Sequence, residues 1–257
     1  MKAAVISPKH ETGLSTITAM IGMTLTWTQQ YTCMMSYLGP SDVPRYLGLG
    51  SLDDKTRSIS QLNKLLQAGA IAPDQITEYS VPVFRDLWLM DTTSTLVTEE
   101  EKAKIISFVF DQVPVDVALC EVCDDDLSKE TTVEILRNSD VIIIIFQPST
   151  NQFDAVKKFL MAQPWAEFKD ILYICNRYDD VIMPLRDISK NMGVAHTDMC
   201  KLHYNPWIPK MCEAGQLDDI VKFTVMKDPR VINLNNDLKE ITSYFATGLR
   251  AKLKWEG

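Results

Sequence analysis

The chain has 257 residues, of which 46% are hydrophobic and 23% are charged, and its formal net charge is −8 at pH 7. This length allows one large α/β domain with a full core, and we predict a single domain over residues 1–257. The acidic balance and the absence of a long Lys/Arg run exclude nucleic-acid binding that depends on net charge alone.

The sequence carries no sign of membrane insertion or export. No apolar run reaches the roughly 18–20 residues that span a bilayer, and no signal peptide opens the chain. The six cysteines fall mainly in apolar, strand-like segments, which is typical of reduced, buried thiols. Cys120-x-x-Cys123 allows a redox pair or half a zinc site as an alternative to core cysteines, but no second CxxC pair supplies further ligands. We therefore expect a cytoplasmic protein with core cysteines.

Apolar, strand-like runs alternate with helical patterns along the chain. We predict strands over 2–7, 32–37, 87–91, 116–122, 140–146, 171–175 and 199–203. We predict helices over 15–30, 57–69, 99–112, 128–138, 151–162, 180–191, 210–217 and 233–253. The alternation predicts right-handed βαβ crossovers. The fold class is therefore α/β, with a mostly parallel twisted sheet and helices on both faces.

Two predicted helices have acidic, capped starts. Thr98 precedes three glutamates, and Ser128 precedes Lys129 and Glu130, which suits the positive end of a helix dipole. The acids at 124–126 allow a divalent-cation site, but a solvated acidic segment before the helix is the favoured alternative.

Residues 2–16 have the layout of a phosphate-binding loop. A short apolar strand is followed by a turn containing Gly13, by Ser15 and Thr16, and by a long helix. In such a loop, backbone amides and the helix N-terminus surround phosphate oxygens. The residue before Ser15, where a phosphate-binding lysine is expected, is Leu14. The sequence therefore predicts the shape of an anion site without its principal cation.

The loop resembles that of the ParA/MinD group of P-loop proteins, and the similarity extends over nearly the whole chain. Lys9 falls on the family-defining first lysine, Gly13 on the last glycine, Leu14 on the second lysine and Ser15 on the hydroxyl that binds magnesium. The resemblance implies ATP with Mg²⁺ as the cofactor, Ser15 as the metal ligand, and a homodimer in which Lys9 reaches the partner's nucleotide. The residues implied to bind the nucleotide are Lys9, Thr12, Gly13, Leu14, Ser15, Thr16, Glu121 and Asn176.

Later segments carry the same resemblance with further departures. Tyr37 and Gly39 stand where the family has two aspartates, and Glu121 stands at the aspartate of the Walker B strand. Ser139-Asp140 resembles the start of the family's next strand, and Asn176 resembles the asparagine that contacts adenine. Segments 203–206 and 213–215 resemble the following proline-containing loop and short helix.

These departures predict impaired catalysis, and we assign no catalytic residue. Loss of a charged donor to a buried phosphate costs about 1.5–3 kcal/mol, or about ten- to a hundredfold in affinity. Loss of a donor that stabilises transition-state charge costs a further ~10²–10³ in rate. We expect apolar Leu14 and aromatic Tyr37 to face the phosphate site.

Ordinary structural roles remain open for the same residues. Lys9 alone, or Lys9 with His10 and Glu11, allows a solvated loop tip as well as a phosphate contact. Ser15 is also a suitable helix N-cap. Glu121 allows an ordinary polar strand end, and Asn176 allows a role in satisfying turn backbone.

The end of the chain is basic and partly amphipathic. Phe245, Leu249 and Leu253 are spaced by four residues, which predicts a packed helix face. A membrane-seeking helix, as MinD-like proteins have, is the alternative, and we expect no membrane contact.

Three functions follow from the resemblance. The first is a catalytically impaired, dimeric localisation or assembly factor, closest in character to TadZ-type proteins, with a protein partner in a cell-envelope or partitioning assembly. TadZ-type proteins usually carry an additional receiver-like domain before this strand. The second is an active partitioning ATPase in which Lys9 and Glu121 compensate. The third is a scaffold without nucleotide, in which Leu14 and Tyr37 fill the old site.

Overall fold

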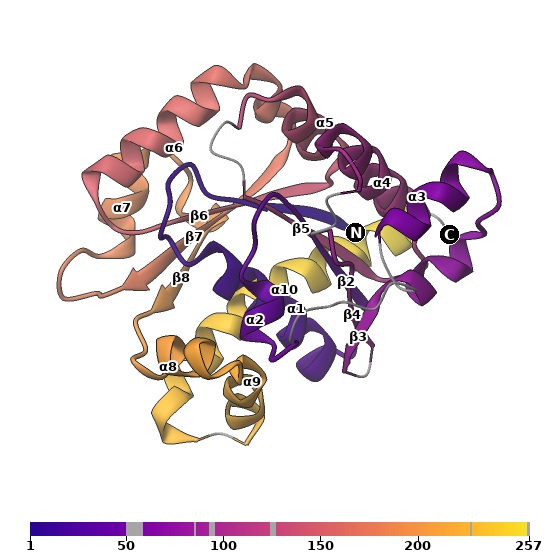
Figure 1. The fold of residues 1–257 in the computed structure, drawn as a ribbon. Coiled ribbons are helices and arrows are strands. Elements are labelled where there is room, and N and C mark those ends of the chain that lie inside the picture. Colours follow the sequence, from indigo (N-terminus) through magenta and orange to yellow (C-terminus); the bar gives the residue numbers. More distant parts are fainter. Residues whose placement is uncertain (50–58, 85, 93–95, 124–126, 227, 256–257) are drawn as a thin grey trace.

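The computed structural model describes residues 1–49, 59–84, 86–92, 96–123, 127–226 and 228–255. Within these residues, eight strands form one sheet in the order β3-β4-β2-β5-β1-β6-β7-β8 (Figure 1). Their bounds are β1 Lys2–Ile6, β2 Cys33–Leu38, β3 Val81–Phe84, β4 Leu87–Leu89, β5 Val117–Val122, β6 Val141–Phe146, β7 Asp170–Tyr178 and β8 Met199–His203. The β3–β4 pair is antiparallel, and the other neighbouring strands are parallel. The predicted α/β class with a mostly parallel sheet is confirmed.

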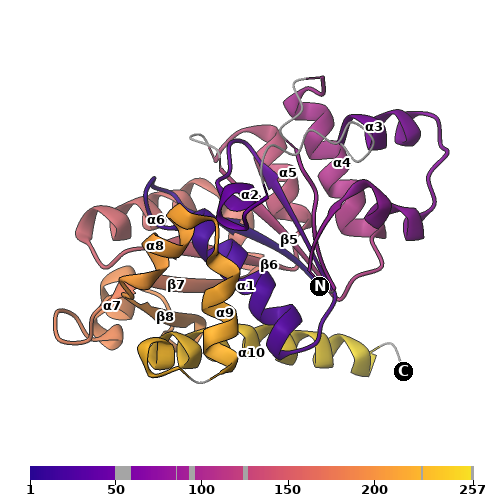
Figure 2. The same ribbon diagram turned by 60° about the horizontal axis from the view of Figure 1, so that its bottom comes forward.

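Helices cover both faces of this sheet. Figure 2 shows one face under α1 Leu14–Thr28, α8 Trp207–Ala214, α9 Leu217–Val225 and α10 Ile232–Trp255. The other face lies under α4 Glu99–Gln112, α5 Glu130–Asn138, α6 Thr150–Ala162 and α7 Leu185–Met192. Two short helices complete this set: α2 Val43–Tyr46 follows β2, and α3 Ile59–Gln67 packs on α4.

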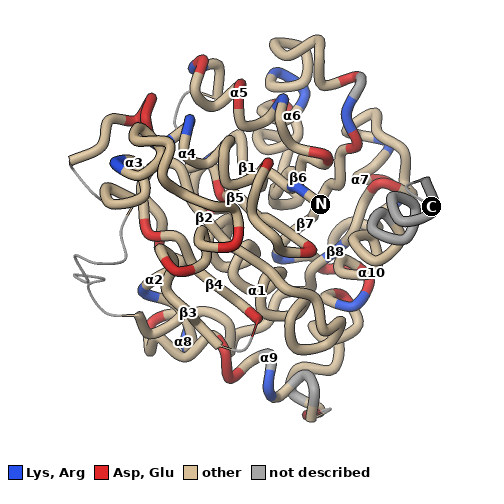
Figure 3. The backbone as a smooth tube through the Cα atoms, turned by 90° about the vertical axis from the view of Figure 1, so that its right-hand side faces the viewer, with Lys and Arg blue, Asp and Glu red and all other residues tan. Residues whose placement is uncertain are grey.

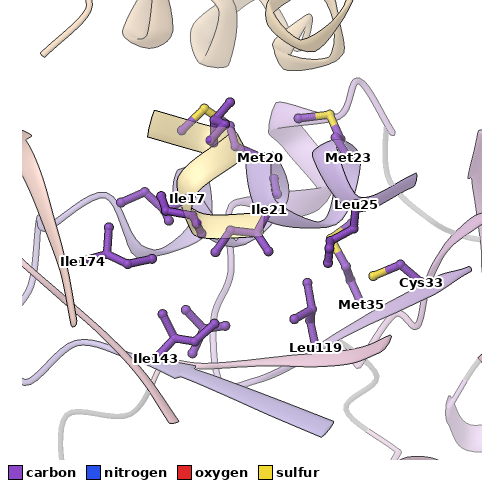
Figure 4. Packing of buried hydrophobic residues seen from close by; sticks show 14 of the residues in the cluster. Ile17, Met20, Ile21, Met23, Leu25, Cys33, Met35, Leu119, Ile143 and Ile174 are labelled. Atoms are coloured by element: carbon purple, nitrogen blue, oxygen red, sulfur yellow. The ribbon is translucent and has the colours of Figure 1, made fainter. Parts of the chain in front are cut away.

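The central strands are apolar because helices cover both of their faces. Every residue of β6 is buried, as the continuous apolar run predicts. Helix α1 is buried from Ile17 to Thr26, and Figure 4 shows Ile17 and Ile21 on the side that faces Ile143 and Leu119 of the sheet. This packing fixes the start of α1 next to the ends of β1 and β5.

Several predicted boundaries were wrong for local reasons. The predicted helix 180–191 begins only at Leu185, because Pro184 precedes it in an extended conformation that a proline at that point favours. The predicted helix 210–217 joins two helices, since Gly215 adopts φ 64° and ends α8 before α9 begins. The sequence analysis also missed α2, α9 and the short strand β3, and residues 57–58 of one predicted helix lie outside the described residues.

The two predicted helix caps had different outcomes. Thr98 caps α4, as predicted, and it does so in a reciprocal capping box with Glu101. The N-cap residue of α5 is Lys129 rather than Ser128, and the Lys129 side chain makes no capping hydrogen bond. The acids at 124–126 lie outside the described residues.

At the C-terminal end, α10 packs against β8, α1 and α9. Phe245 is fully buried in the core, which confirms a packed helix face at this residue; the side chains of Leu249 and Leu253 lie outside the description. No helix in the described part of the chain is long and apolar enough to cross a membrane. In the view of Figure 3, acidic and basic positions are interspersed.

The cysteines are free thiols, and most are buried, as predicted. Cys120 is buried and Cys123 is partly exposed. Among the described residues, no group of three or more His, Cys, Asp or Glu side chains is arranged to hold a metal ion.

Candidate functional site

A cavity of about 460 Å³ lies where β1, β5 and the start of α1 meet. Its lining includes the whole of loop 7–16, together with Glu121 and Asp42. The structure therefore brings together Lys9, Thr12, Gly13, Leu14, Ser15, Thr16 and Glu121, seven of the eight residues predicted to bind a nucleotide. Parallel strands end on this side of the sheet, where ligands of open α/β folds bind.

The loop has a conformation that glycine makes accessible. Gly13 precedes α1 with φ 88°, and a Cβ atom there would lie 2.5 Å from Nδ2 of Asn176. The first amides of α1 have no carbonyl partner within the helix, so they are available to an anion. The loop therefore has a glycine turn before a helix N-terminus, which is the arrangement on which the anion-site prediction depends.

Neighbouring strand ends hold the loop in place. The Asn176 Nδ2 group donates to the Thr12 carbonyl at 2.6 Å, and its Oδ1 accepts from the Arg177 amide at 2.8 Å. Gln147 Nε2 donates to the Glu11 carbonyl at 2.7 Å. Asn176 thus satisfies loop and turn backbone, which is the structural role left open for it, and it also lines a second cavity.

Ser15 and Glu121 form the polar corner of the cavity. The Ser15 hydroxyl donates to Glu121 Oε1 at 2.5 Å, and the Ser41 hydroxyl donates to Oε2 at 2.5 Å. The Glu121 side chain is fully buried. Burial raises the pKa of this carboxyl, and the two hydroxyl donors lower it by less. The alternative that Ser15 is the N-cap is wrong, because the N-cap is Gly13 and Ser15 lies in the first turn.

The cavity has little positive charge. Leu14 lines it and also packs against the hydrophobic core, so its position supplies no ammonium. Lys9 is the one Lys or Arg among the described lining residues. It is exposed, and none of the described carboxylates forms an ion pair with it. His10 and Glu11 are exposed loop residues that line the same space.

Tyr37 does not face the phosphate site, and that expectation was wrong. Its side chain is buried, it does not line the cavity, and its hydroxyl donates to Asp91 Oδ1 at 2.5 Å. Burial, and then the hydrogen bond to Asp91, raise the pKa of Tyr37. Gly39 is also explained, since a Cβ atom there would lie 2.5 Å from the Cys123 carbonyl oxygen. An aspartate at position 39 would therefore require the backbone to move.

A second cavity of about 460 Å³ adjoins the first. The two share Glu11, Gly13, Thr16 and Tyr46. Its other lining residues come from α1, α2, the ends of β7 and β8, the loop after β8, and α8. Parts of the predicted segments 203–206 and 213–215 therefore meet here. The Arg45 guanidinium lies 4.8 Å from the centre of the Tyr46 ring, so the pair forms part of the wall.

The sequence analysis missed several residues of these cavities. Asp42, Arg45 and Tyr46 line them, and Ser41 donates to Glu121; all four follow β2, where the sequence analysis considered only the replaced acids. The polar pair Ser41-Asp42 directly after Gly39-Pro40 was the available signal. Asp91, the partner of Tyr37, had no such signal, because 54 positions separate the two residues.

The residues present fit a nucleotide phosphate with its metal ion. The Thr12 hydroxyl is buried in the loop, and within the described residues it has no hydrogen-bond partner. Gly13 leaves the space that a Cβ atom would fill, and Ser15 with Glu121 supplies oxygen ligands of the kind that Mg²⁺ prefers. The sheet and the glycine turn before α1 have the arrangement of the P-loop class of α/β folds.

Comparison with known proteins identifies the fold within this class. No protein-family model matches the chain, and no curated protein sequence matches it. Solved structures do. A ParA family ATPase from Chlorobium tepidum TLS has a TM-score of 0.71 and 16% identity, with 92% of this chain and 96% of that chain covered.

Two MinD structures give the same result. The septum site-determining protein MinD complexed with Mg-ADP from Pyrococcus horikoshii OT3 has a TM-score of 0.70 and 17% identity, over 96% of this chain and 98% of that one. The MinC:MinD cell division complex of Aquifex aeolicus has a TM-score of 0.71 and 14% identity, with 95% of this chain and 96% of that chain covered. The chain has the fold of the ParA/MinD ATPases.

Proposed function

We propose that the chain is a catalytically impaired ParA/MinD-like protein that binds ATP with Mg²⁺ and acts as a dimeric localisation or assembly factor. One observation carries the proposal: the glycine loop and the Ser15–Glu121 pair line one cavity, while the positions of the lysine and the first acid hold Leu14 and Tyr37. The binding geometry remains, and the charges that drive hydrolysis are replaced.

The magnitudes favour binding over turnover. Loop amides, Ser15 and Lys9 remain near the phosphate position, so loss of one ammonium lowers affinity by about ten- to a hundredfold. Hydrolysis also needs a group that orients the attacking water. Tyr37 cannot serve, because its hydroxyl donates to Asp91 outside the cavity.

The proposal includes a single domain over 1–257, a cytoplasmic location and a protein partner. One sheet that contains all eight described strands, from β3 at one edge to β8 at the other, supports a single domain, and α10 packs against β8. MinD of Aquifex aeolicus was solved with MinC, which supports a partner-bound role in an envelope or partitioning assembly. A TadZ-like role is the most specific form of the proposal and rests on the replaced loop residues.

Thermal unfolding with and without ATP and Mg²⁺ tests nucleotide binding. A ligand that binds the native state raises the midpoint of unfolding. At a ligand concentration a hundred times Kd, the free energy of unfolding increases by about 2.7 kcal/mol. Phosphate release should stay near the uncatalysed background. A midpoint that ATP and Mg²⁺ leave unchanged would favour the nucleotide-free scaffold.

A second function, an active partitioning ATPase, has one observation in its favour. Lys9 and Glu121 line the same cavity, as the compensating residues of that alternative must. Phosphate release by the wild-type protein at rates typical of partitioning ATPases would establish this function in place of the first.

Lys9 supports the dimer through its exposure and its lack of an ion pair among the described residues. Lys9→Ala should weaken ATP-dependent self-association in sedimentation velocity. Lys158→Ala is the matched control, since Lys158 is exposed on α6 and does not line the phosphate cavity. Equal association of both variants would show that Lys9 is not part of the interface.

A further inference from the structure

Residues 41–48, which contain α2 and are called the α2 segment below, form part of the wall of both cavities. Asp42 and Tyr46 line the first cavity. Arg45 and Tyr46 line the second cavity. The segment therefore lies beside the phosphate loop and reaches from there toward α8, against which α2 packs.

The first residues of the α2 segment are bonded to the polar corner of the phosphate cavity. The Ser41 hydroxyl donates to Glu121 Oε2 at 2.5 Å, and its oxygen accepts from the Val43 amide at 3.2 Å. The Asp42 amide donates to Ser15 Oγ in a longer contact of 3.4 Å. Ser15 and Glu121 are the two residues that fit a metal ion, so this end of the segment is attached directly to the proposed ligand site.

Bonds within the α2 segment make it one body. The Asp42 carboxylate accepts from Arg45 Nε at 3.2 Å and from the Tyr46 hydroxyl at 3.2 Å. Val43 and Leu47 are buried in the hydrophobic core below. A short helix that is bonded internally and anchored by two apolar side chains moves as a unit.

The last residue of the α2 segment meets the end of α8, backbone against backbone. A Cβ atom on Gly48 would lie 2.6 Å from the Gly215 carbonyl oxygen, and one on Gly215 would lie 3.1 Å from the Arg45 carbonyl oxygen. Both glycines have positive φ, at 67° and 64°. Because the two backbones approach so closely, a shift of one is passed to the other and is not absorbed by a side chain.

We propose that the α2 segment couples occupancy of the phosphate cavity to the packing of α8. The proposal rests on the proposed function, in which Mg·ATP binds at Ser15 and Glu121. A bound cation holds the Glu121 carboxylate, so Ser41 has a fixed acceptor and the segment behind it loses freedom of movement. Helix α8 meets the other end of this segment and becomes more rigid with it. Such coupling is reciprocal, so disturbing the contact with α8 weakens ligand binding.

Hydrogen exchange of the full-length chain, followed by mass spectrometry, tests the coupling. Exchange is measured without ligand, with ATP and EDTA, and with Mg·ATP. Mg·ATP should slow the exchange of amides 207–214 in α8 by about fivefold or more, whereas ATP with EDTA should leave them unchanged. Helix α7, on the other face of the sheet, is the internal reference and should keep its exchange rate.

Substitutions at Ser41 test the end of the segment at the phosphate cavity. Ser41→Ala removes the donor to Glu121 and should abolish the response of α8 to Mg·ATP. Ser41→Thr keeps a hydroxyl at this position and should retain the response. A residue with a purely structural role would change the stability of the protein but would not separate the Mg·ATP response from that seen with ATP and EDTA.

A substitution at Gly48 tests the end at α8. Gly48→Ala places a Cβ atom against the Gly215 carbonyl and should weaken Mg·ATP binding by about fivefold in calorimetric titration. Gly193→Ala is the matched control, because Gly193 also has positive φ, at 72°, but a Cβ atom there meets nothing within 4 Å. It should bind Mg·ATP as the wild type does.

The outcomes distinguish this proposal from the proposed function. If Mg·ATP slowed exchange in loop 7–16 but not in α8, or slowed α8 equally in Ser41→Ala, the coupling would be overturned while nucleotide binding stands. If Mg·ATP gave no binding heat and changed exchange nowhere, both proposals would fall.

Discussion

Two neighbouring strand ends in this molecule place their polar side chains in different surroundings. Tyr37 of β2 and Glu121 of β5 are partners in the sheet register, and both are buried. Glu121 lines the cavity at loop 7–16, and two serine hydroxyls donate to it. Tyr37 lies outside the cavity and donates to Asp91, which follows β4.

In the proposed function, this difference separates a position that still takes part in binding from one that takes no part in catalysis. An acid replaced by a larger acid keeps its place in the cavity, because its oxygens can still accept from hydroxyls at the loop. An acid replaced by tyrosine requires a new acceptor, because a buried phenol without one is costly. Asp91 supplies that acceptor. Binding groups and catalytic groups can therefore diverge at adjacent positions.

Restoring the missing cation is the largest change we expect on the binding side. Leu14→Lys should tighten Mg·ATP binding by about ten- to a hundredfold, since a charged donor to phosphate contributes about 1.5–3 kcal/mol. Repulsion between the new lysine and the positive end of the helix dipole offsets about 0.3–1 kcal/mol of this gain. Calorimetric titration measures the change, with Leu14→Met as the uncharged control. If Leu14→Lys and Leu14→Met bound Mg·ATP equally well, a cation at position 14 would not contribute to phosphate binding.

Removing the new partner tests the Tyr37 side of the comparison. Tyr37→Phe takes one donor from the buried Asp91 carboxyl and should lower the free energy of unfolding by about 1–3 kcal/mol in urea titration. Nucleotide affinity should change little, because the hydroxyl does not reach the cavity. A variant that loses ATP binding while keeping its stability would place Tyr37 in the site after all.

The glycine loop can be tested against a glycine in open space. Gly13→Ala and Gly69→Ala both force alanine into positive φ, at 88° and 61°, which costs roughly 1 kcal/mol each. Only at Gly13 does the new Cβ atom meet a neighbour, Asn176 Nδ2. Thermal unfolding should show a larger loss for Gly13→Ala, accompanied by weaker ATP binding. Similar losses and unchanged binding would mean that the loop adapts.

The smallest effect concerns the charge of Glu121. Burial raises its pKa in the folded protein, so the folded state holds this proton more tightly than the unfolded chain. That stabilising contribution is present below the ordinary value of 4.5 and is lost as the pH rises through the folded pKa.

Glu121→Gln cannot ionise, so its melting temperature should rise relative to that of the wild type as the pH increases from about 4.5 upward. Melting curves without nucleotide measure this difference. Glu167→Gln, at an exposed position, serves as the control and should follow the wild type at every pH. If the melting temperatures of Glu121→Gln and the wild type changed with pH in parallel, the pKa of Glu121 would not be raised in the folded protein.

The sequence determined the sheet, the order of its layers and the phosphate loop. Short, β-branched apolar runs such as 141–146 favour strands covered on both faces, and the strand–glycine–hydroxyl–helix order is local. These features depend on neighbours within a few residues, so they can be predicted from periodicity. The predicted set at loop 7–16 did gather around one cavity.

Only the tertiary structure decided where the remaining side chains point and what they contact. Tyr37 meets Asp91 across 54 positions, and Asn176 meets the Thr12 carbonyl across 164. The His203 ring meets the Asp237 carboxyl group across 34 positions, which joins β8 to α10. Such pairs depend on crossover connections and packing, which bring distant residues together, and no local pattern encodes them.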